Sequence, residues 1–188
     1  MRLEATLKQR ITWTAASLLA VITLGSLTGT GRTTVTAASL ERSNVERNKE
    51  AARRWSEELW SRGNLAVADD IIAAGYERHD PGDPFPARGP ADVKRIVTML
   101  RTMLPDFHIQ VDAMLADGEF VISRYTATAT DTVGYMGMPP TGKSIKTSAI
   151  QIFRFADGKI VESWAARDDL GTLKQLGHWA PPAPRASK

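Results

Sequence analysis

The sequence predicts an α+β domain in which helices come first and an antiparallel sheet follows. Two observations support this prediction. Between residues 44 and 103 apolar side chains recur at helical spacing. From residue 108 onward they alternate with a period of two between short turn sequences. Because a two-residue turn leaves no room for a crossover helix, consecutive strands must pair antiparallel. Helices followed by strands indicate helices packed on one face of a curved sheet.

Three helices are expected before the sheet, over residues 44–62, 64–73 and 90–103. Trp55 and Leu59 lie on the apolar stripe of the first helix. Pro90 suits the first position of the third helix, because an N–H group there would lack a helical partner anyway. The segment 75–90 is rich in proline and glycine, so a long loop is expected there. Long loops in compact domains are often functional.

Four strands and a short final helix complete the domain. The strands are expected over residues 108–116, 119–130, 144–155 and 159–167, and the helix over 170–177. Asp117-Gly118 and Asp157-Gly158 are typical of tight hairpin turns. In the first strand, alternation predicts which side chains point into the core. They are Ile109, Val111, Ala113 and Leu115.

The first 38 residues are expected to be an export signal and not part of the fold. Basic residues precede the uncharged stretch 11–31, and small residues follow near Ala37 and Ala38, where a signal peptidase would cut. The predicted location is therefore periplasmic or extracellular. An uncleaved membrane anchor is the alternative, because roughly 20 uncharged residues also span a bilayer. The domain is expected over residues 44–178, with a disordered tail over 179–188.

The composition excludes several function classes. The first 38 residues hold four of the 24 basic side chains and one of the 21 acidic ones, which leaves 20 of each for the domain. A domain without net charge lacks the basic footprint of a nucleic-acid-binding protein. The absence of cysteine excludes disulfides, thiolate metal sites and a cysteine nucleophile. The three histidines are scattered, whereas zinc sites use closely spaced pairs, so no metal is expected.

The last strand brings two carboxylates close to an aromatic ring. By strict alternation, Ile160, Glu162, Trp164 and Asp168 share one face. A half-apolar cavity would hold such a set. A carboxyl group against an apolar wall has a raised pKa, which suits acid–base catalysis near neutral pH. The alternative is structural: Asp168 caps the helix that follows, and Glu162 lies at a solvent-exposed rim.

The motif "ERHDP" offers His79 and Asp80 next to a proline. One interpretation is turn chemistry, in which Asp80 bonds to its own backbone. The other interpretation is functional, with His79 donating a hydrogen bond to a carbonyl group of a substrate.

Five segments follow one another in an order that matches a known family. They are "ERHDP" (77–81), "LPDF" (104–107), "GMPPTGKS" (137–144), "FRFADGKIVESW" (153–164) and "DDLGTLKQLG" (168–177). On these segments, the region from about 45 to 178 resembles the SnoaL-like polyketide cyclases, also called ester cyclases. Each segment alone is weak, but the five in order are fairly specific.

The resemblance implies a fold, a chemistry and a set of site residues. The implied fold is that of the nuclear transport factor 2-like superfamily. It is a cone-shaped α+β barrel with three N-terminal helices on a strongly curved, mainly antiparallel sheet around a deep pocket. Cyclases of the family close rings by intramolecular aldol condensation without cofactor or metal. Their acid–base carboxylate corresponds to Asp168, their aromatic residue to Trp164 and their loop histidine to His79. A homodimer is also implied.

One position departs from the family pattern. Relatives commonly carry Gly-Thr-His at the end of the second long strand, whereas "TATDT" places Asp131 where the histidine would be. If Asp131 lies near the acid–base group, two carboxylates share a proton and one pKa rises.

The sequence therefore predicts a cofactor-independent, cyclase-type enzyme that acts on a small hydrophobic molecule containing a carbonyl group. Asp168 and His79 are the expected catalytic residues. The expected substrate-binding residues are Trp164, Glu162, Asp131 and Asp80. The alternative is an exported, non-catalytic pocket protein that binds a small hydrophobic ligand, because a fold does not fix a function.

Overall fold

The computed structural model describes residues 36–180 of the chain. The predicted export signal and the predicted tail fall almost entirely outside this range. The chain divides into two compact units, Met1–Leu40 and Glu41–Lys188, and the second unit contains the sheet and the functional site. Within residues 36–180, no helix is both long and apolar enough to cross a membrane.

Three helical segments precede the main strands, as predicted. α1 (Ala37–Arg54) continues directly into a π-helical segment (Trp55–Ser61), so the first helix ends close to the expected residue. α3 (Gly89–Met103) confirms the third helix. α2 (Val67–Ile71) is shorter than expected, because Ile72 already has extended backbone and begins a strand.

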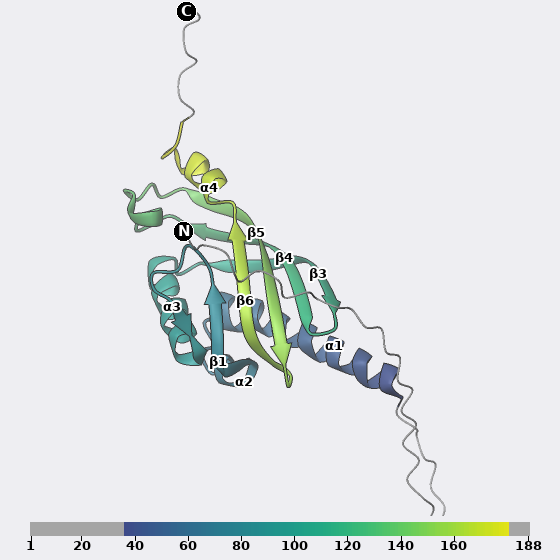
Figure 1. Cartoon of the computed structure of the whole chain (residues 1–188). Coiled ribbons are helices and arrows are strands. Elements are labelled where there is room, and N and C mark those ends of the chain that lie inside the picture. Colours follow the sequence, from purple (N-terminus) through teal and green to yellow (C-terminus); the bar gives the residue numbers. More distant parts are fainter. Residues whose placement is uncertain (1–35, 181–188) are drawn as a thin grey trace, which may run out of the picture. The chain divides into compact units, whose positions relative to one another are not determined.

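Six strands form one sheet in the spatial order β2-β1-β6-β5-β4-β3 (Figure 1). They are β1 (Ile72–His79), β2 (Ala87–Arg88), β3 (His108–Asp117), β4 (Phe120–Thr130), β5 (Ser144–Ala156) and β6 (Lys159–Arg167). The four predicted strands pair antiparallel in chain order, and a short helix, α4 (Asp169–Leu176), follows them.

The segment expected to be a loop forms β1 and β2 at its two ends. β1 pairs parallel with β6, and β2 pairs antiparallel with β1. The loop prediction was therefore wrong at both ends. The partner of β1 lies far away in the sequence, so the local proline and glycine content did not reveal the pairing.

The two predicted hairpin turns are confirmed. β3 joins β4 through Gly118 and Glu119, one residue later than predicted, and β5 joins β6 through Asp157 and Gly158 as predicted. Asp157 and Gly158 have φ angles of 51° and 75°. Two positive φ angles match the type I′ turn, whose twist suits the twist of the flanking strands.

A bulge in β3 changes which of its side chains are buried. The pairing with β4 shifts between Val111 and Ala113. Beyond this bulge Met114 packs against the core, whereas Leu115 is 70% exposed. The predicted inward set was therefore right for Ile109, which is buried, and wrong for Ala113 and Leu115.

A second bulge lies in β6 and has a larger consequence. Opposite β5, Ile160 pairs with Phe155 and Glu162 pairs with Arg154, so Val161 is an extra residue without a partner. A single extra residue exchanges the two faces of every position that follows it.

Beyond Val161, Ser163 and Arg167 point to the inner face of the sheet. Their partners on β5, Phe153 and Ala149, are both buried. Strict alternation was therefore wrong for β6, because it assigned the residues after the bulge to the opposite face.

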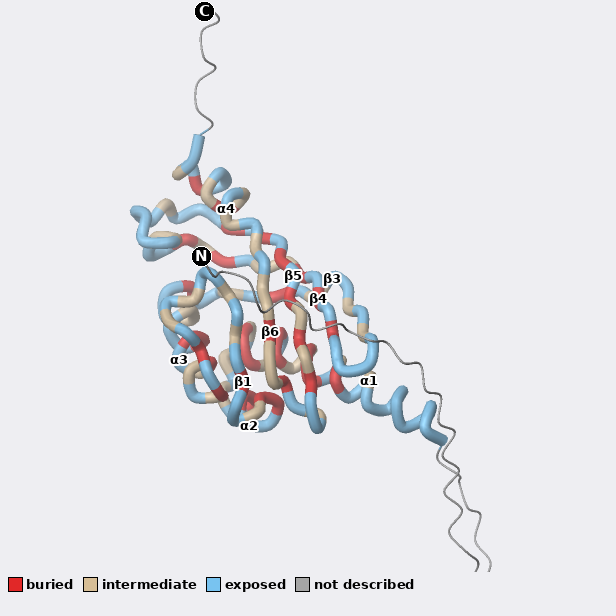
Figure 2. The backbone as a smooth tube through the Cα atoms, viewed as in Figure 1, coloured by how far each residue is buried: buried red, intermediate tan, exposed pale blue. Residues whose placement is uncertain are grey.

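The core lies between the inner face of the sheet and the helices, where the buried segments gather in Figure 2. At its centre the Trp55 ring lies 5.5 Å from the Phe153 ring in an edge-on arrangement and 6.0 Å from the Tyr76 ring. None of the three side chains is more than 1% exposed. Such aromatic contacts stabilise the fold beyond the burial of area alone.

Candidate active site

A cavity of about 400 Å³ opens between the inner face of the sheet, α3 and the π-helical segment. This volume lies within the range of small-molecule sites. Most of its wall is apolar, including Ile96, Met99, Leu100, Met103, Phe107 and Ile145. Its charged lining residues are Arg78, Asp83 and Arg167.

Arg78 is the centre of a buried ionic cluster beside the cavity. Its Nε donates to Asp83 Oδ2 at 2.7 Å, and its Nη2 donates to Asp80 Oδ2 at 2.7 Å. Arg167 Nη1 donates to the same Asp80 oxygen at 2.7 Å. The side chains of Arg78, Asp80 and Asp83 are 5%, 3% and 8% exposed. Arg167 Nε also donates to Asp169 Oδ1 at 3.4 Å. Both guanidinium groups are therefore balanced by carboxylates in a poorly solvated place, which makes each charge depend on the others.

Asp83 is the carboxylate of this cluster that faces the cavity. Its Oδ1 accepts no hydrogen bond from any residue in the range 36–180. Burial raises the pKa of Asp83 above its ordinary value, although the neighbouring Arg78 opposes that shift. A carboxyl group with one free oxygen and a raised pKa is suited to proton transfer.

Gly82 leaves room for the contact between Arg167 and Asp80. A Cβ atom at Gly82 would lie 1.7 Å from Arg167 Nη2. Any larger residue would therefore force Arg167 away from its carboxylate partner. The loop glycine is explained by this close approach.

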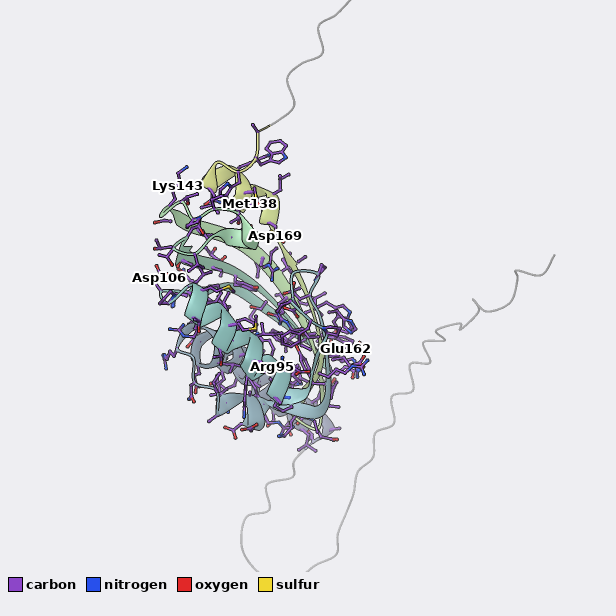
Figure 3. All side chains as sticks on the ribbon, turned by 90° about the vertical axis from the view of Figure 1, so that its left-hand side faces the viewer. Arg95, Asp106, Met138, Lys143, Glu162 and Asp169 are labelled. Carbon is purple, nitrogen blue, oxygen red and sulfur yellow. The ribbon has the colours of Figure 1, made fainter. Side chains whose placement is uncertain are left out.

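The residues that the sequence singled out do gather, but on the outer face of the sheet. His79 Nε2 lies 2.9 Å from Glu162 Oε1, and the His79 ring stacks on Trp164 at 5.3 Å. Arg154 donates two hydrogen bonds to Glu162 Oε2. Figure 3 shows Glu162 on the side of the sheet away from α3. None of these four residues lines the cavity.

The bulge at Val161 is the physical reason for this correction. Trp164 pairs with Ile152, and His79 pairs with Trp164 in the parallel ladder, so all three lie on the outer face. The outer cluster remains open to solvent, since His79 is 43% and Glu162 23% exposed in their side chains. Hydrogen bonds from Arg154 and from His79 hold the pKa of Glu162 below its ordinary value.

Asp168 also lies outside the cavity, and the prediction that its carboxyl group points into the pocket was wrong. The residue is exposed, and its Oδ1 accepts a hydrogen bond from the Gly171 N–H at 2.8 Å. It is the N-cap of α4. This is the structural alternative that the sequence suggested for Asp168. An aspartate at this position caps the helix, because its side chain satisfies an otherwise unpaired N–H group.

Asp131 holds a loop and does not itself line the cavity, although its partner Gly134 does. It is fully buried and accepts hydrogen bonds from the Gly134 N–H and from the N–H and hydroxyl of Thr141. Burial alone would raise the pKa of Asp131, but these hydrogen bonds outweigh it and the pKa is lowered. The expected proton shared with Asp168 is therefore not supported. Asp80 likewise lies behind the cavity wall, between two arginines.

Sequence reasoning missed Arg78, Asp83 and Arg167. Arg78 is the immediate neighbour of His79, and alternation alone could have assigned the two residues to opposite faces. Which of the two residues points to the inner face could not be predicted, because the bulge in β6 shifts the register and nothing in the sequence indicates that bulge. Within residues 36–180, no group of three or more metal-ligating side chains is present.

Comparison with known proteins agrees with the fold. The family model of SnoaL-like polyketide cyclases matches residues 50–176. The aklanonic acid methyl ester cyclase DnrD of Streptomyces peucetius is 30% identical over 129 residues, which cover 63% of this chain and 86% of that protein. A solved structure of a candidate polyketide cyclase from Acidithiobacillus ferrooxidans is 34% identical. The match covers 71% of this chain and 96% of that one, with a TM-score of 0.62.

A structure of an NTF2-like protein from Burkholderia pseudomallei K96243, 18% identical with a TM-score of 0.57, supports the fold alone. The match covers 69% of this chain and 97% of that one. The cone-shaped α+β fold with a curved six-stranded sheet is therefore confirmed. The chain belongs to the SnoaL-like polyketide cyclase family.

Proposed function

We propose that this chain is a cyclase-type enzyme that acts on a small, mostly apolar carbonyl compound in the cavity, with Asp83 as the acid–base group. The position of Asp83 is the observation that supports this proposal most. It lines an apolar cavity, it keeps one carboxylate oxygen free, and burial raises its pKa. Arg78 holds the other oxygen and fixes the orientation of the group.

The proposed step transfers one proton and forms one carbon–carbon bond. Asp83 takes a proton from the carbon next to a carbonyl group, and the electron pair of that C–H bond moves onto the carbonyl oxygen as an enolate. The enolate carbon attacks a second carbonyl group of the same molecule and closes the ring. The resulting alkoxide takes the proton back from Asp83, so the enzyme ends unchanged and needs no oxidant or reductant.

A non-catalytic pocket protein is the second candidate. The placement of Asp168 favours it, since the carboxylate that corresponds to the acid–base group of the family caps α4 outside the cavity. On this reading the cavity binds a small hydrophobic ligand, and the charged cluster serves only to hold the loop that follows β1.

Aklanonic acid methyl ester is the first substrate to test, because a relative is named for its cyclisation. For the wild type we expect ring closure that follows enzyme concentration. Asp83→Asn should lower kcat by about 10²- to 10⁴-fold, the usual contribution of general acid–base catalysis. Asp168→Asn should stay within about twofold, because asparagine caps a helix as well as aspartate does.

Loss of activity in Asp168→Asn with retention in Asp83→Asn would overturn the assignment of Asp83. Binding of the ester without turnover would support the non-catalytic alternative. The expected homodimer remains a prediction, which a mass measurement in solution would check.

A further inference from the structure

Three hydrogen-bond donors without acceptors belong to residues that line the cavity. Trp60 Nε1 and Arg78 Nη1 are buried and have no hydrogen-bond partner within residues 36–180. The Tyr125 hydroxyl has no partner among these residues either, and Tyr125 is only 7% exposed. All three residues line the cavity. Buried donors are almost always satisfied, so each of these is a candidate for a ligand contact.

Two of the three donors belong to neighbouring side chains. The Arg78 guanidinium carbon is 5.0 Å from the centre of the Trp60 ring. Its Nε and Nη2 are occupied by the two aspartates, so Nη1 is the nitrogen left for another acceptor. Tyr125 lies in the same row across the sheet as Arg167, which is hydrogen-bonded to Asp80. All three donors therefore belong to residues that line the cavity beside the ionic cluster.

The strand register explains why there is open space at Tyr125. Tyr125 on β4 pairs with Ala149 on β5, and Ala149 pairs with Arg167 on β6. A methyl group thus stands between two long side chains on the inner face, which leaves room above it for a ligand. Burial raises the pKa of Tyr125, so the hydroxyl keeps its proton and remains a donor.

We propose that the Tyr125 hydroxyl, Trp60 Nε1 and Arg78 Nη1 form a binding site for a carbonyl oxygen of the substrate. The ligand group must be an acceptor, because an indole N–H and a guanidinium N–H can only donate. It must also be neutral when it binds, because Arg78 and Arg167 are already balanced by Asp80, Asp83 and Asp169. A ketone or ester oxygen meets both requirements.

The site rests on the proposed function and completes it. A carbonyl oxygen becomes negative when Asp83 removes the neighbouring proton. Donors that are already oriented stabilise that charge more than they stabilise the neutral ketone. The same donors thus bind the substrate weakly and the enolate strongly, which is the distinction that accelerates a reaction.

Two buried tyrosines provide a matched test. Tyr125 has a free hydroxyl, whereas the Tyr76 hydroxyl is hydrogen-bonded to Ser163 Oγ at 2.6 Å and does not line the cavity. Each is replaced by phenylalanine, which removes one oxygen and keeps the ring. The binding probes are 2-acetylnaphthalene, its analogue 2-isopropenylnaphthalene without the oxygen, and the anion 2-naphthoate.

The wild type should bind 2-acetylnaphthalene more than about tenfold more tightly than 2-isopropenylnaphthalene, because the oxygen meets three donors. Tyr125→Phe removes one of them and should lower that ratio about five- to tenfold, the value of one net hydrogen bond, without weakening 2-isopropenylnaphthalene. Tyr76→Phe should keep the ratio of the wild type. The C=O stretch of bound 2-acetylnaphthalene should lie at lower frequency in the wild type than in Tyr125→Phe.

Thermal unfolding separates binding from a structural role. Tyr76→Phe loses a protein hydrogen bond, so its unfolding midpoint should fall by about 2–4 °C. Tyr125→Phe should keep or raise the midpoint, because it removes a buried hydroxyl without a partner. A midpoint that falls as much as in Tyr76→Phe would show that the hydroxyl serves the fold and would overturn the proposal.

Three further results would also overturn the site. They are an unchanged ligand ratio in Tyr125→Phe, tighter binding of 2-naphthoate than of the ketone, and no binding of the ketone to the wild type. These outcomes are independent of turnover. If Asp83→Asn stays active while Tyr125→Phe lowers the binding preference for the ketone, the proposed role of Asp83 is wrong and the carbonyl site is supported. The opposite pair of results would remove the site and keep the proposed function.

Discussion

The inner and outer faces of β1 and β6 carry two clusters of similar composition and different surroundings. On the inner face, Arg78 joins Asp83 in a buried network beside an apolar cavity. On the outer face, His79 joins Glu162 in a pair that is open to solvent. Arg78 and His79 are consecutive residues of one sequence motif, but their side chains lie in different environments on opposite faces of the sheet. Both clusters contain paired charges, so it is burial that distinguishes the inner cluster at the cavity from the outer cluster.

The largest expected difference between the two faces is in stability. Arg78→Met leaves the buried Asp83 without its arginine and Asp80 with Arg167 alone, so the free energy of unfolding should fall by about 3–5 kcal/mol. His79→Ala removes an exposed pair and should cost no more than about 1 kcal/mol. Urea unfolding of both variants checks this. Similar losses in the two variants would remove the distinction between the faces.

The two carboxylates should also respond to pH in opposite directions. Burial raises the pKa of Asp83, so its contribution to stability is full below the pKa of the unfolded chain and is lost as the pH rises through the folded pKa. Hydrogen bonds from Arg154 lower the pKa of Glu162, so its contribution is present above the unfolded pKa and is lost as the pH falls through the folded pKa.

Unfolding free energies of the wild type, Asp83→Asn and Glu162→Gln between about pH 3 and about pH 7 test this. The stability of the wild type relative to Asp83→Asn should decrease with rising pH. Its stability relative to Glu162→Gln should increase. Two differences of the same sign would contradict the assignment of the two environments.

The smallest expected effect concerns Asp168. If this residue only caps α4, Asp168→Ala should lower the free energy of unfolding by about 1 kcal/mol, and Asp168→Asn should change it by a few tenths at most. Chemical unfolding measures both. A loss in Asp168→Asn as large as in Asp168→Ala would mean that the charge, and not the cap, is needed.

Periodicity and turn residues were sufficient to predict most of the fold. The change from helical to alternating spacing gave α3 and the four antiparallel strands, and Asp157-Gly158 gave a hairpin. β1 could not be found in this way, since its pairing with β6 is a tertiary interaction across most of the domain. Local composition there indicated a loop.

The candidate site was predicted less well, and one residue accounts for much of the difference. The sequence identified the correct strand and the correct loop motif, but Val161 shifts the register of β6. Glu162 and Trp164 therefore lie outside, while Arg167 lies inside. A bulge depends on how two strands twist against each other, and an apolar valine in an apolar strand gives no sign of it.

Which side chains of β6 point inward can be measured directly with single introduced cysteines, because the chain contains no cysteine of its own. Ser163 is 1% exposed and pairs with the buried Phe153, whereas Ala166 is exposed. Single variants Ser163→Cys and Ala166→Cys would be treated with a thiol reagent under native conditions. The bulge predicts that Ala166→Cys reacts like a thiol in an unfolded peptide and that Ser163→Cys is protected. Rapid reaction of Ser163→Cys with protection of Ala166→Cys would mean strict alternation and would return Glu162 and Trp164 to the cavity.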